Sequence, residues 1–329
     1  MRIHVHTFPS RLEFRHPFRI AHGVRTGTDV VLVRLEWNDL TAFGEATLPP
    51  YLMDTIESVT RFFSLPEIQN IAFPISVENL FDELHRSHPA NMPAKAALDM
   101  ALWQLLAKYQ RTSLNELLKI SSQEKIPHSY TIAVGNSDEM KEKFAIGLEN
   151  NFRFFKLKLD GIHDEQIIDD YCSLTSLPFA VDANQSWRSV EAALKISEKL
   201  IHQGCVLIEQ PFDKHDLVMS RALKEAIDIP VIADEACQLE VDIDKLSASF
   251  SGVNIKLQKC GGITPALRMI HRARELNLKV LIGCMSESSI GCNAAEVLTP
   301  LCDWADLDGP FLIRNNEEIL MLAESFSNG

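Results

Sequence analysis

Hydrophobic and polar residues alternate through much of the first 60 residues. The segments RIHVHTF, DVVLVRLEW and TAFGEAT show either this alternation or runs of β-branched residues. Both patterns are typical of strands, and the short polar turns favour antiparallel pairing. From about residue 54 to 120 the period changes to three and four, most clearly in AKAALDMALWQLLAKYQ, just after Pro93. Because that period predicts helices, residues 1–120 are expected to form an α+β unit.

The period changes again after IPHSYTIAVG. Short apolar segments then alternate with amphipathic stretches such as SVEAALKISEKLIHQG and TPALRMIHRARELNL; the apolar segments are FFKLKLD, PFAVDAN, CVLIEQP, PVIADEA, GVNIKLQ, KVLIGCM and CDWADLD. Alternation of this kind predicts parallel βαβ units, and seven or eight of them favour a closed barrel over residues 121–310. A doubly wound open sheet is the alternative, although no Gly-x-Gly-x-x-Gly follows a strand.

Composition narrows the classes of partner and compartment. Apolar residues make up 46% of the chain, which is ample for a large core, and the net charge is −13 without a lysine- or arginine-rich run. Nucleic acid and anionic membranes are therefore not expected as main partners. No stretch reaches the roughly 20 apolar residues of a membrane span, and the N-terminus has no apolar signal segment. Seven cysteines without a Cys-x-x-Cys pair predict reduced thiols and a cytoplasmic protein.

Charged residues recur at the ends of the predicted strands. Asp182, Glu209 and Asp234 end three consecutive strands, and Lys256 lies on the next. In a parallel barrel these ends meet at one mouth, where three carboxylates would repel one another unless a cation binds them. Their hard oxygen atoms favour Mg²⁺ over Zn²⁺. Any one of them alone is more simply a helix cap or a turn residue, but recurrence in phase on successive strands favours a metal site.

Two lysines flank this predicted metal site. Lys156 and Lys158 alternate with leucines in FKLKLD and therefore point to the same face of their strand. Lys158 precedes the three acidic strands and Lys256 follows them, so the two lysines are expected on opposite sides of the cavity. That arrangement suits removal of a proton from one face of a carbon and its return to the other face.

These motifs resemble the muconate-lactonising subgroup of the enolase superfamily. The resemblance rests on the K-x-K pair, DANQSW, IEQP, ADE, NIKLQKCGGIT and GCMSES, together with PFRIAHG and FGEA near the start. It implies a (β/α)7β barrel under an α+β capping domain that segment 311–329 completes. It also implies Mg²⁺ on the three carboxylates, Lys158 and Lys256 as the acid/base pair, and Lys156 near the substrate carboxylate.

Residues of the last predicted strand help to distinguish between the different reactions that enzymes of this subgroup catalyse. Asp306 and Asp308 alternate with Leu307, so both point toward the mouth. The resemblance to dipeptide epimerases implies that they bind the α-ammonium group of the substrate. A solvated acidic turn before Gly309 and Pro310 is the alternative reading.

The resemblance implies further contacts for a dipeptide. Thr131 ends the first barrel strand, while Cys284 and Ser286 follow KVLIG. The loop IAHGVRTGTD (20–29) is expected to reach over the mouth, with Arg25 as the cation for an acidic second residue and Arg19 in reserve. The family's arginine aligns two positions before Arg25, at Gly23, and this departure weakens the expectation of glutamate.

The sequence therefore predicts a cytoplasmic, Mg²⁺-dependent isomerase, of the class that racemises or epimerises amino acid derivatives. It would invert the α-carbon of the second residue of an Ala-Glu-like dipeptide by 1,1-proton transfer through an enediolate. An o-succinylbenzoate synthase or an N-acylamino-acid racemase of the same subgroup is the nearer alternative, and a non-catalytic binding protein is the more distant one. Besides the dipeptide, the sequence allows a second copy of the chain as a partner in a homo-oligomer.

Overall fold

The computed structural model describes residues 1–20, 23–121 and 126–325, without the side chains of residues 18–20, 23 and 325. The N-terminal part is built on an antiparallel sheet with strand order β1-β2-β3. Its strands are β1 (His4–Ile20), β2 (Gly23–Trp37) and β3 (Leu40–Leu48). The three alternating segments of the sequence are thus confirmed as strands. Most of segment 20–29, expected as a loop, instead continues β2.

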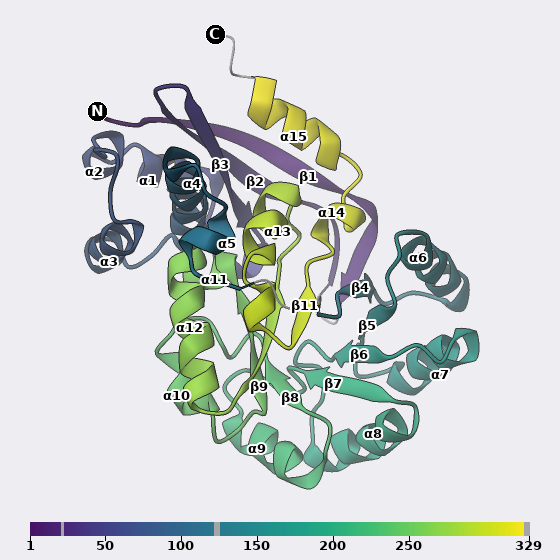
Figure 1. The fold of residues 1–329 in the computed structure, drawn as a ribbon. Helices are drawn as coiled ribbons and strands as arrows, with labels where there is room; N and C mark the ends of the chain where they lie inside the picture. The colour runs from purple at the N-terminus through teal and green to yellow at the C-terminus, as the bar shows by residue number, and fades with distance from the viewer. Residues whose placement is uncertain (21–22, 122–125, 326–329) are drawn as a thin grey trace.

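Helices cover one side of this sheet (Figure 1). They are η1 (Pro50–Leu52), α1 (Ile56–Phe63), α2 (Pro66–Gln69), α3 (Val77–Ser87), α4 (Met92–Gln110) and α5 (Leu114–Leu117). The expected long helix is α4, which begins beside Pro93 and is buried on most of its surface. It packs so closely on β3 that a Cβ at Gly44 would lie 1.9 Å from the Ala97 carbonyl oxygen. Helix α4 therefore forms the core of the cap.

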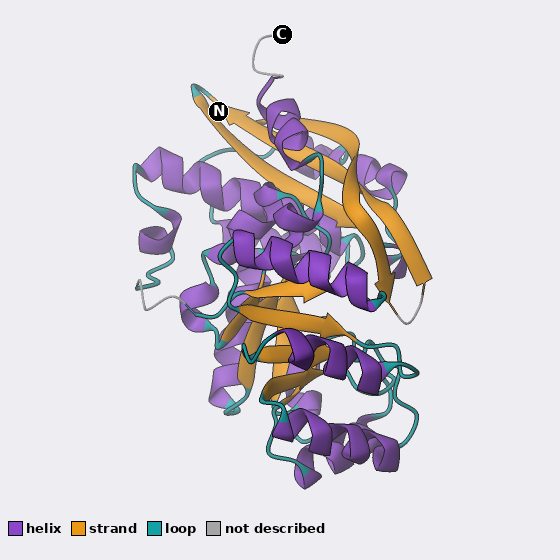
Figure 2. Ribbon diagram, turned by 90° about the vertical axis from the view of Figure 1, so that its right-hand side faces the viewer, coloured by secondary structure: helices purple, strands orange, loops and turns teal. Residues whose placement is uncertain are grey.

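Eight parallel strands form the second part, in the sequential order β4 to β11. They are β4 (Ser129–Ile132), β5 (Phe154–Lys158), β6 (Phe179–Asp182), β7 (Cys205–Glu209), β8 (Val231–Ala233), β9 (Gly252–Lys256), β10 (Lys279–Gly283) and β11 (Trp304–Asp306). The Ala305 amide donates to the Pro127 carbonyl at 3.0 Å, which brings the last strand against the first. The predicted barrel under a separate capping sheet is thus confirmed, and the doubly wound alternative is wrong (Figure 2).

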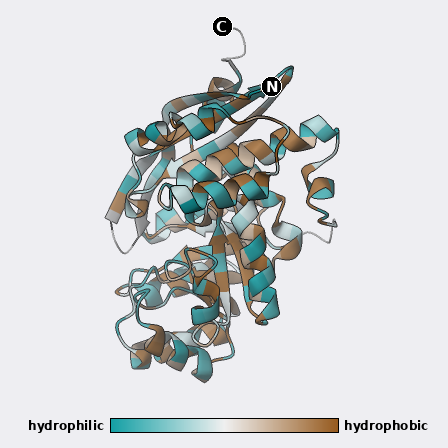
Figure 3. Ribbon diagram, turned by 90° about the vertical axis from the view of Figure 1, so that its left-hand side faces the viewer, coloured by the Kyte–Doolittle hydropathy of each residue, from teal (hydrophilic) through white to brown (hydrophobic). Residues whose placement is uncertain are grey.

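Helices connect successive barrel strands and surround them. They are α6 (Ser137–Glu149), α7 (Asp164–Leu174), α8 (Val190–His202), α9 (Leu217–Ala226), α10 (Asp242–Leu246), α11 (Leu257–Cys260), α12 (Ile263–Glu275) and α13 (Ser289–Glu296), with η2 (Thr299–Leu301) before β11. Figure 3 shows hydrophilic and hydrophobic residues mixed along the helices, as the amphipathic pattern predicts. Among the described residues, no helix combines the length and apolar character needed to cross a membrane.

The chain returns to the capping sheet at its end. Helix α14 (Gly309–Leu312) leads to α15 (Asn316–Ser325), which lies on β1 and β2 (Figure 1). Ile313 and Ile319 pack there against Leu12 and Leu32 in one buried cluster. The Arg314 amide donates to the Glu13 carbonyl at 2.8 Å. These contacts agree with a cap that includes segment 311–329, while the exact domain limits stay a prediction.

A buried acid joins the cap to the outside of the barrel. Asp99 on α4 accepts hydrogen bonds from the Thr264 amide at 3.0 Å and the Thr264 hydroxyl at 2.5 Å, at the first turn of α12. The Trp103 indole donates to the same hydroxyl at 2.9 Å. Gly262 is required here, because a Cβ at that position would lie 2.5 Å from Asp99 Oδ2. These contacts fix the cap relative to the C-terminal ends of the strands.

Candidate active site

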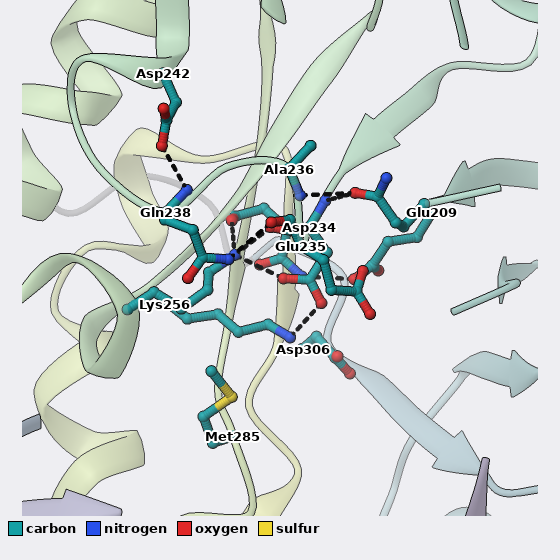
Figure 4. Close-up of polar contacts among 12 residues, drawn as sticks. Glu209, Asp234, Glu235, Ala236, Gln238, Asp242, Lys256, Met285 and Asp306 are labelled. Atoms are coloured by element: carbon teal, nitrogen blue, oxygen red, sulfur yellow. Dashed lines mark hydrogen bonds and ion pairs between the residues drawn. The ribbon is translucent and has the colours of Figure 1, made fainter. Parts of the chain in front are cut away.

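Charged side chains from six of the eight strands or their ends gather at one mouth of the barrel. Asp182, Glu209 and Lys256 are the last residues of β6, β7 and β9, and Asp234 follows β8 directly. Figure 4 shows Glu209, Asp234, Lys256 and Asp306 converging from different strands. Parallel strands in register bring their carboxyl ends together, which is why regularly spaced charges in the sequence become neighbours in space.

Three of these carboxylates could hold one metal ion. One oxygen each from Asp182, Glu209 and Asp234 can be chosen so that all three lie within 4.8 Å of one another. The residues are 0%, 0% and 5% exposed. Three buried carboxylates this close need positive charge, and an all-oxygen donor set suits a hard divalent cation. The residues present therefore fit the metal site that the sequence predicts.

Lys156 neutralises this cluster from within the protein. Its Nζ lies 2.6 Å from Glu209 Oε2, 2.8 Å from Asp306 Oδ2 and 3.4 Å from Asp182 Oδ2. Burial disfavours the ammonium form, but these carboxylates outweigh burial and raise the pKa of Lys156 well above its ordinary value. Because Lys156 is only 1% exposed and these carboxylates favour its charged form, it is suited to electrostatic support of the site.

Lys158 and Lys256 occupy opposite sides of the mouth. Lys158 Nζ lies 2.6 Å from Asp182 Oδ2, and Lys256 Nζ lies 2.7 Å from Asp234 Oδ2. Strands β5 and β9, which carry them, are four positions apart in an eight-stranded barrel. Both lysines line the same cavity. The structure thus brings the two lysines to the positions that the sequence predicts, while their roles stay a prediction.

A fourth lysine, which was not predicted from the sequence, holds the Asp234 carboxylate in place. Lys259 Nζ lies 2.6 Å from Asp234 Oδ1 and donates to the carbonyls of Asp234 at 2.7 Å and Asn254 at 3.0 Å. All three ammonium hydrogens therefore have acceptors. Asn254 in turn donates to Glu209 Oε1 at 2.8 Å. Alternation along GVNIK could have revealed Asn254, two residues before Lys256, whereas Lys259 lies on a helical turn that strand alternation does not cover.

Asp306 and Asp308 are both buried, at 6% and 3% exposure, so the solvated acidic turn is wrong. Asp306 accepts from the Ser129 hydroxyl at 2.6 Å and from Lys156, whereas Asp308 accepts from the Thr131 amide at 2.6 Å. Burial raises the pKa of Asp308 to about 7, with a further contribution from the charge of Asp306. Burial acts in the same direction on Asp306, but Lys156 outweighs it and holds the pKa of Asp306 at about 2.

The cavity over these groups is closed on one side by the cap. The predicted contact residues Arg25, Thr131, Cys284 and Ser286 all line it. Arg25 Nη2 lies 3.5 Å from the Ser286 hydroxyl. Its Nη1 is buried without a hydrogen-bond partner in the described part of the chain. Arg25 therefore retains a donor for a ligand. The side chains of Arg19 and of position 23 lie outside the described structure.

Several further residues line the cavity without having been predicted. They include Pro49, Tyr51, Asn184, Gln185, Lys214, Glu235, Gln238, Met285 and Leu312. The Tyr51 hydroxyl, on the cap segment after β3, contacts the Met285 sulfur of the barrel. Glu235 follows Asp234 directly, and burial raises its pKa to about 8, with a smaller contribution from Asp234. Its place in ADE was a usable signal, whereas nothing in the sequence pairs Tyr51 with Met285.

Comparison with known proteins identifies the family. Residues 2–119 match the N-terminal domain of mandelate racemase and muconate lactonizing enzyme, and residues 139–305 match the enolase C-terminal domain-like family. The chain is 36% identical over 311 residues to the L-Ala-D/L-Glu epimerase of Bacteroides thetaiotaomicron, covering 94% of this chain and 80% of that protein. It is 34% identical over 306 residues to the L-Ala-D/L-amino acid epimerase of a Maribacter species, covering 93% and 89%.

A solved structure agrees with these sequence relatives. The dipeptide epimerase from Methylococcus capsulatus, complexed with Mg and the dipeptide L-Arg-D-Lys, superposes with a TM-score of 0.89 at 29% identity, covering 95% of this chain and 92% of that one. The expected class, racemases and epimerases of amino acid derivatives, is the class of the curated relatives. The chain therefore belongs to the mandelate racemase and muconate lactonizing enzyme family of the enolase superfamily.

Proposed function

We propose that this protein is a Mg²⁺-dependent dipeptide epimerase that inverts the α-carbon of the second residue. The observation that carries the proposal is the position of Lys158 and Lys256 on opposite strands of one cavity, between a carboxylate cluster and the buried Asp308. A free dipeptide has a carboxylate at one end and an ammonium group at the other. With a divalent cation on the carboxylate cluster, the cavity would offer a partner of opposite charge for each end.

The charges of the cavity orient the substrate. Its carboxylate would face the cation site of Asp182, Glu209 and Asp234, and its ammonium group would face Asp308. The α-carbon of the second residue carries that carboxylate, so this orientation places it between Lys158 and Lys256. Mg²⁺, which the Methylococcus relative binds together with its dipeptide, would supply Lewis-acid stabilisation of negative charge on the carboxylate.

Proton transfer then belongs to the two lysines. One lysine removes the α-proton on its own face and the other returns a proton on the opposite face, which inverts the carbon. The removing lysine must be neutral. Burial favours the neutral form of Lys256, but Asp234 outweighs burial and raises the pKa of Lys256 well above its ordinary value. Lys256 therefore becomes a base only when the charge of Asp234 is balanced by another group.

Arg25 supports an acidic side chain at the second residue. Its guanidinium reaches the cavity with one unpartnered nitrogen, and a carboxylate would supply the missing acceptor. Tyr51 and Met285 form an apolar wall beside it. One curated relative is named for glutamate and the other for amino acids in general, so we propose a preference for acidic over apolar second residues.

The two rival activities explain less of the cavity. A succinylbenzoate synthase or an N-acylamino-acid racemase acts on a substrate without a free α-ammonium group, and would leave the buried carboxylate of Asp308 without a partner charge. A non-catalytic binding protein would have no use for two lysines on opposite sides of the cavity. Domain limits at residues 1–120 and 121–310, a cytoplasmic location and a homo-oligomer remain predictions.

A library of free L,L-dipeptides in D₂O with Mg²⁺ tests the proposal. Mass spectrometry would report a gain of one mass unit at the second residue of each accepted dipeptide, and chiral chromatography would report the epimer. N-acetylated copies of the same dipeptides and N-acylamino acids form the second panel. Labelling of the N-acylated compounds alone would favour the racemase, and labelling of neither panel would favour the binding protein.

A further inference from the structure

The segment between β10 and α13 forms part of the cavity wall through Cys284, Met285 and Ser286. It contacts two of the cap residues that reach the cavity, since Met285 touches Tyr51 and Ser286 touches Arg25. The shape of the proposed substrate pocket therefore depends on where this segment, residues 284–288, lies relative to the cap. We call it the pocket loop.

Glu287, a residue of the pocket loop itself, holds the loop in place through hydrogen bonds of its side chain. Its Oε1 accepts a hydrogen bond from the Met285 amide at 2.7 Å, and its Oε2 accepts one from Gln258 Nε2 at 3.0 Å. The side chain is only 1% exposed and does not line the cavity. Two glycines make room for it, because a Cβ at Gly291 would lie 2.3 Å from Glu287 Oε2 and one at Gly309 would lie 2.4 Å from its carbonyl oxygen.

A second buried carboxylate reaches the same loop from the cap. Glu45 lies on β3 and is 0% exposed. Its Oε1 accepts from the Ser288 amide at 3.0 Å and the Thr47 hydroxyl at 2.8 Å, and its Oε2 accepts from the Ser288 hydroxyl. Ser288 is also the N-cap of α13. Through the side chain of Glu45, the cap thus binds both the end of the pocket loop and the start of α13.

Gln258 connects the two carboxylates, and its orientation is fixed. Its Oε1 accepts from the Thr47 amide at 3.1 Å, while its Nε2 donates to the Glu45 carbonyl at 2.9 Å as well as to Glu287. The side-chain amide therefore pairs with the edge of β3 as a neighbouring strand would. Gln258 lies two residues after Lys256, so the same contacts tie the cap, the pocket loop and the proposed base together.

We propose that Glu45 and Glu287 are positioning residues, which hold the pocket loop against the cap so that Met285 and Ser286 meet Tyr51 and Arg25. The inference rests on the proposed function only for its kinetic consequence. It also gives a physical role to the glutamates of FGEA and GCMSES, two motifs for which the sequence predicted only a family resemblance and, at Cys284 and Ser286, dipeptide contacts. Neither carboxylate touches the cavity, so neither is proposed to meet the substrate.

The hydrogen-bond polarity makes the two carboxylates unequal. Both partners of Glu287 are donors that cannot reverse, because one is a backbone amide and the other is the pinned Nε2 of Gln258. A Glu287→Gln side chain would therefore press its own NH₂ group against an N–H donor. At Glu45 the Ser288 hydroxyl can rotate and accept, so Glu45→Gln can keep most of its contacts. Two isosteric changes at equally buried sites are expected to differ.

The experiment measures amide hydrogen exchange over residues 284–288 and dipeptide kinetics in parallel, at a temperature at which every variant is folded by circular dichroism. Glu287→Gln should accelerate exchange in this segment and raise KM about tenfold or more, with kcat within about threefold. Glu45→Gln should change both readouts by about threefold or less. Glu149→Gln, an exposed glutamate on α6, is the control and should match the wild type. If Glu287→Gln does not fold, Glu287→Asp replaces it, because its shorter side chain cannot span both donors.

The outcomes separate the inference from the proposed function. Exchange is measured without substrate, so it tests the positioning role even if no dipeptide is turned over. Protection of the pocket loop that stays at the wild-type level in Glu287→Gln would overturn the inference. Equal effects of Glu45→Gln and Glu287→Gln would overturn it as well, because burial of charge and not hydrogen-bond polarity would then control the loop. If Glu287→Gln lost stability while its KM stayed unchanged, the residue would have a purely structural role, and this result would also overturn the inference.

Discussion

Asp306 and Asp308 lie two residues apart at the end of the last barrel strand, yet among the described residues only Asp306 forms an ion pair. The ammonium group of Lys156 lies 2.8 Å from Asp306 Oδ2. Asp308 accepts a backbone hydrogen bond from Thr131 and faces the cavity. The two carboxylates are therefore not equivalent candidates for binding a substrate ammonium group. Asp308 is the better candidate, because its carboxylate forms no ion pair within the described part of the chain.

Neutralising Asp308 should weaken recognition of free dipeptides. A charge-assisted hydrogen bond contributes about 1.5–3 kcal/mol, so Asp308→Asn should lower kcat/KM roughly tenfold to 150-fold. N-acetylation of the substrate should cost the wild type heavily and Asp308→Asn little, because the partner charge is already absent. The measurement is kcat/KM for matched free and acetylated dipeptides. An equal cost of acetylation in both proteins would contradict the assignment.

The raised pKa of Asp308, about 7, predicts a pH dependence. Only the ionised carboxylate attracts an ammonium group, so kcat/KM should rise as pH increases through about 7. Asp308→Asn should remove this rise.

The stability of the protein should change with pH in the opposite direction. The protonated carboxyl of Asp308 contributes stability below its ordinary pKa of 3.8, and this contribution is lost as pH rises through about 7. Thermal melting of both proteins between these pH values checks the second part.

Removing the divalent cation should abolish activity without unfolding the protein. Three carboxylates within reach of one ion leave the substrate carboxylate without its partner when the ion is absent. Chelation should stop epimerisation, Mg²⁺ should restore it, and calorimetry should detect binding. Asp234→Asn should weaken binding most directly, whereas Asp244→Asn, an exposed aspartate on α10, should bind Mg²⁺ as the wild type does. Full activity in chelator would contradict the metal site.

Arg25 should determine how strongly acidic second residues are preferred. Arg25→Ala removes the unpartnered guanidinium nitrogen, so KM for L-Ala-L-Glu should rise about tenfold or more while KM for L-Ala-L-Leu changes little. Arg11→Ala, which alters an exposed arginine paired with Asp29, is the control. Equal changes for both dipeptides would show that Arg25 shapes the cavity without reading charge.

The alternation of polar and apolar residues predicted well which residues gather at the mouth of the barrel, because strands in register convert sequence spacing into spatial proximity. Lys156, Lys158 and the three carboxylates all reach the mouth as their positions predict. The same reasoning could have located Asn254 beside Glu209. Asp306 and Asp308 were correctly paired on one face, but their unequal partners depend on Lys156, which lies about 150 residues away in the chain.

Contacts between the cap and the barrel could not be predicted in this way. Tyr51 meets Met285, and Glu45 meets Ser288, across distances of more than 230 residues in sequence. No local period encodes such pairs, because they depend on how two separately built units dock. The segment around Arg25 was expected to be a loop but continues a long strand, since pairing with β1 extends further than its glycines suggest.

The central claim is that Lys158 and Lys256 act on opposite faces of one α-carbon. Proton NMR in D₂O can follow exchange at that carbon, starting separately from each epimer of an accepted dipeptide. The wild type should exchange and epimerise both epimers. Lys256→Ala should abolish epimerisation yet leave exchange from one epimer, and Lys158→Ala should leave exchange from the other. Epimerisation at the wild-type rate in either variant, or exchange in both variants from the same epimer, would contradict the account.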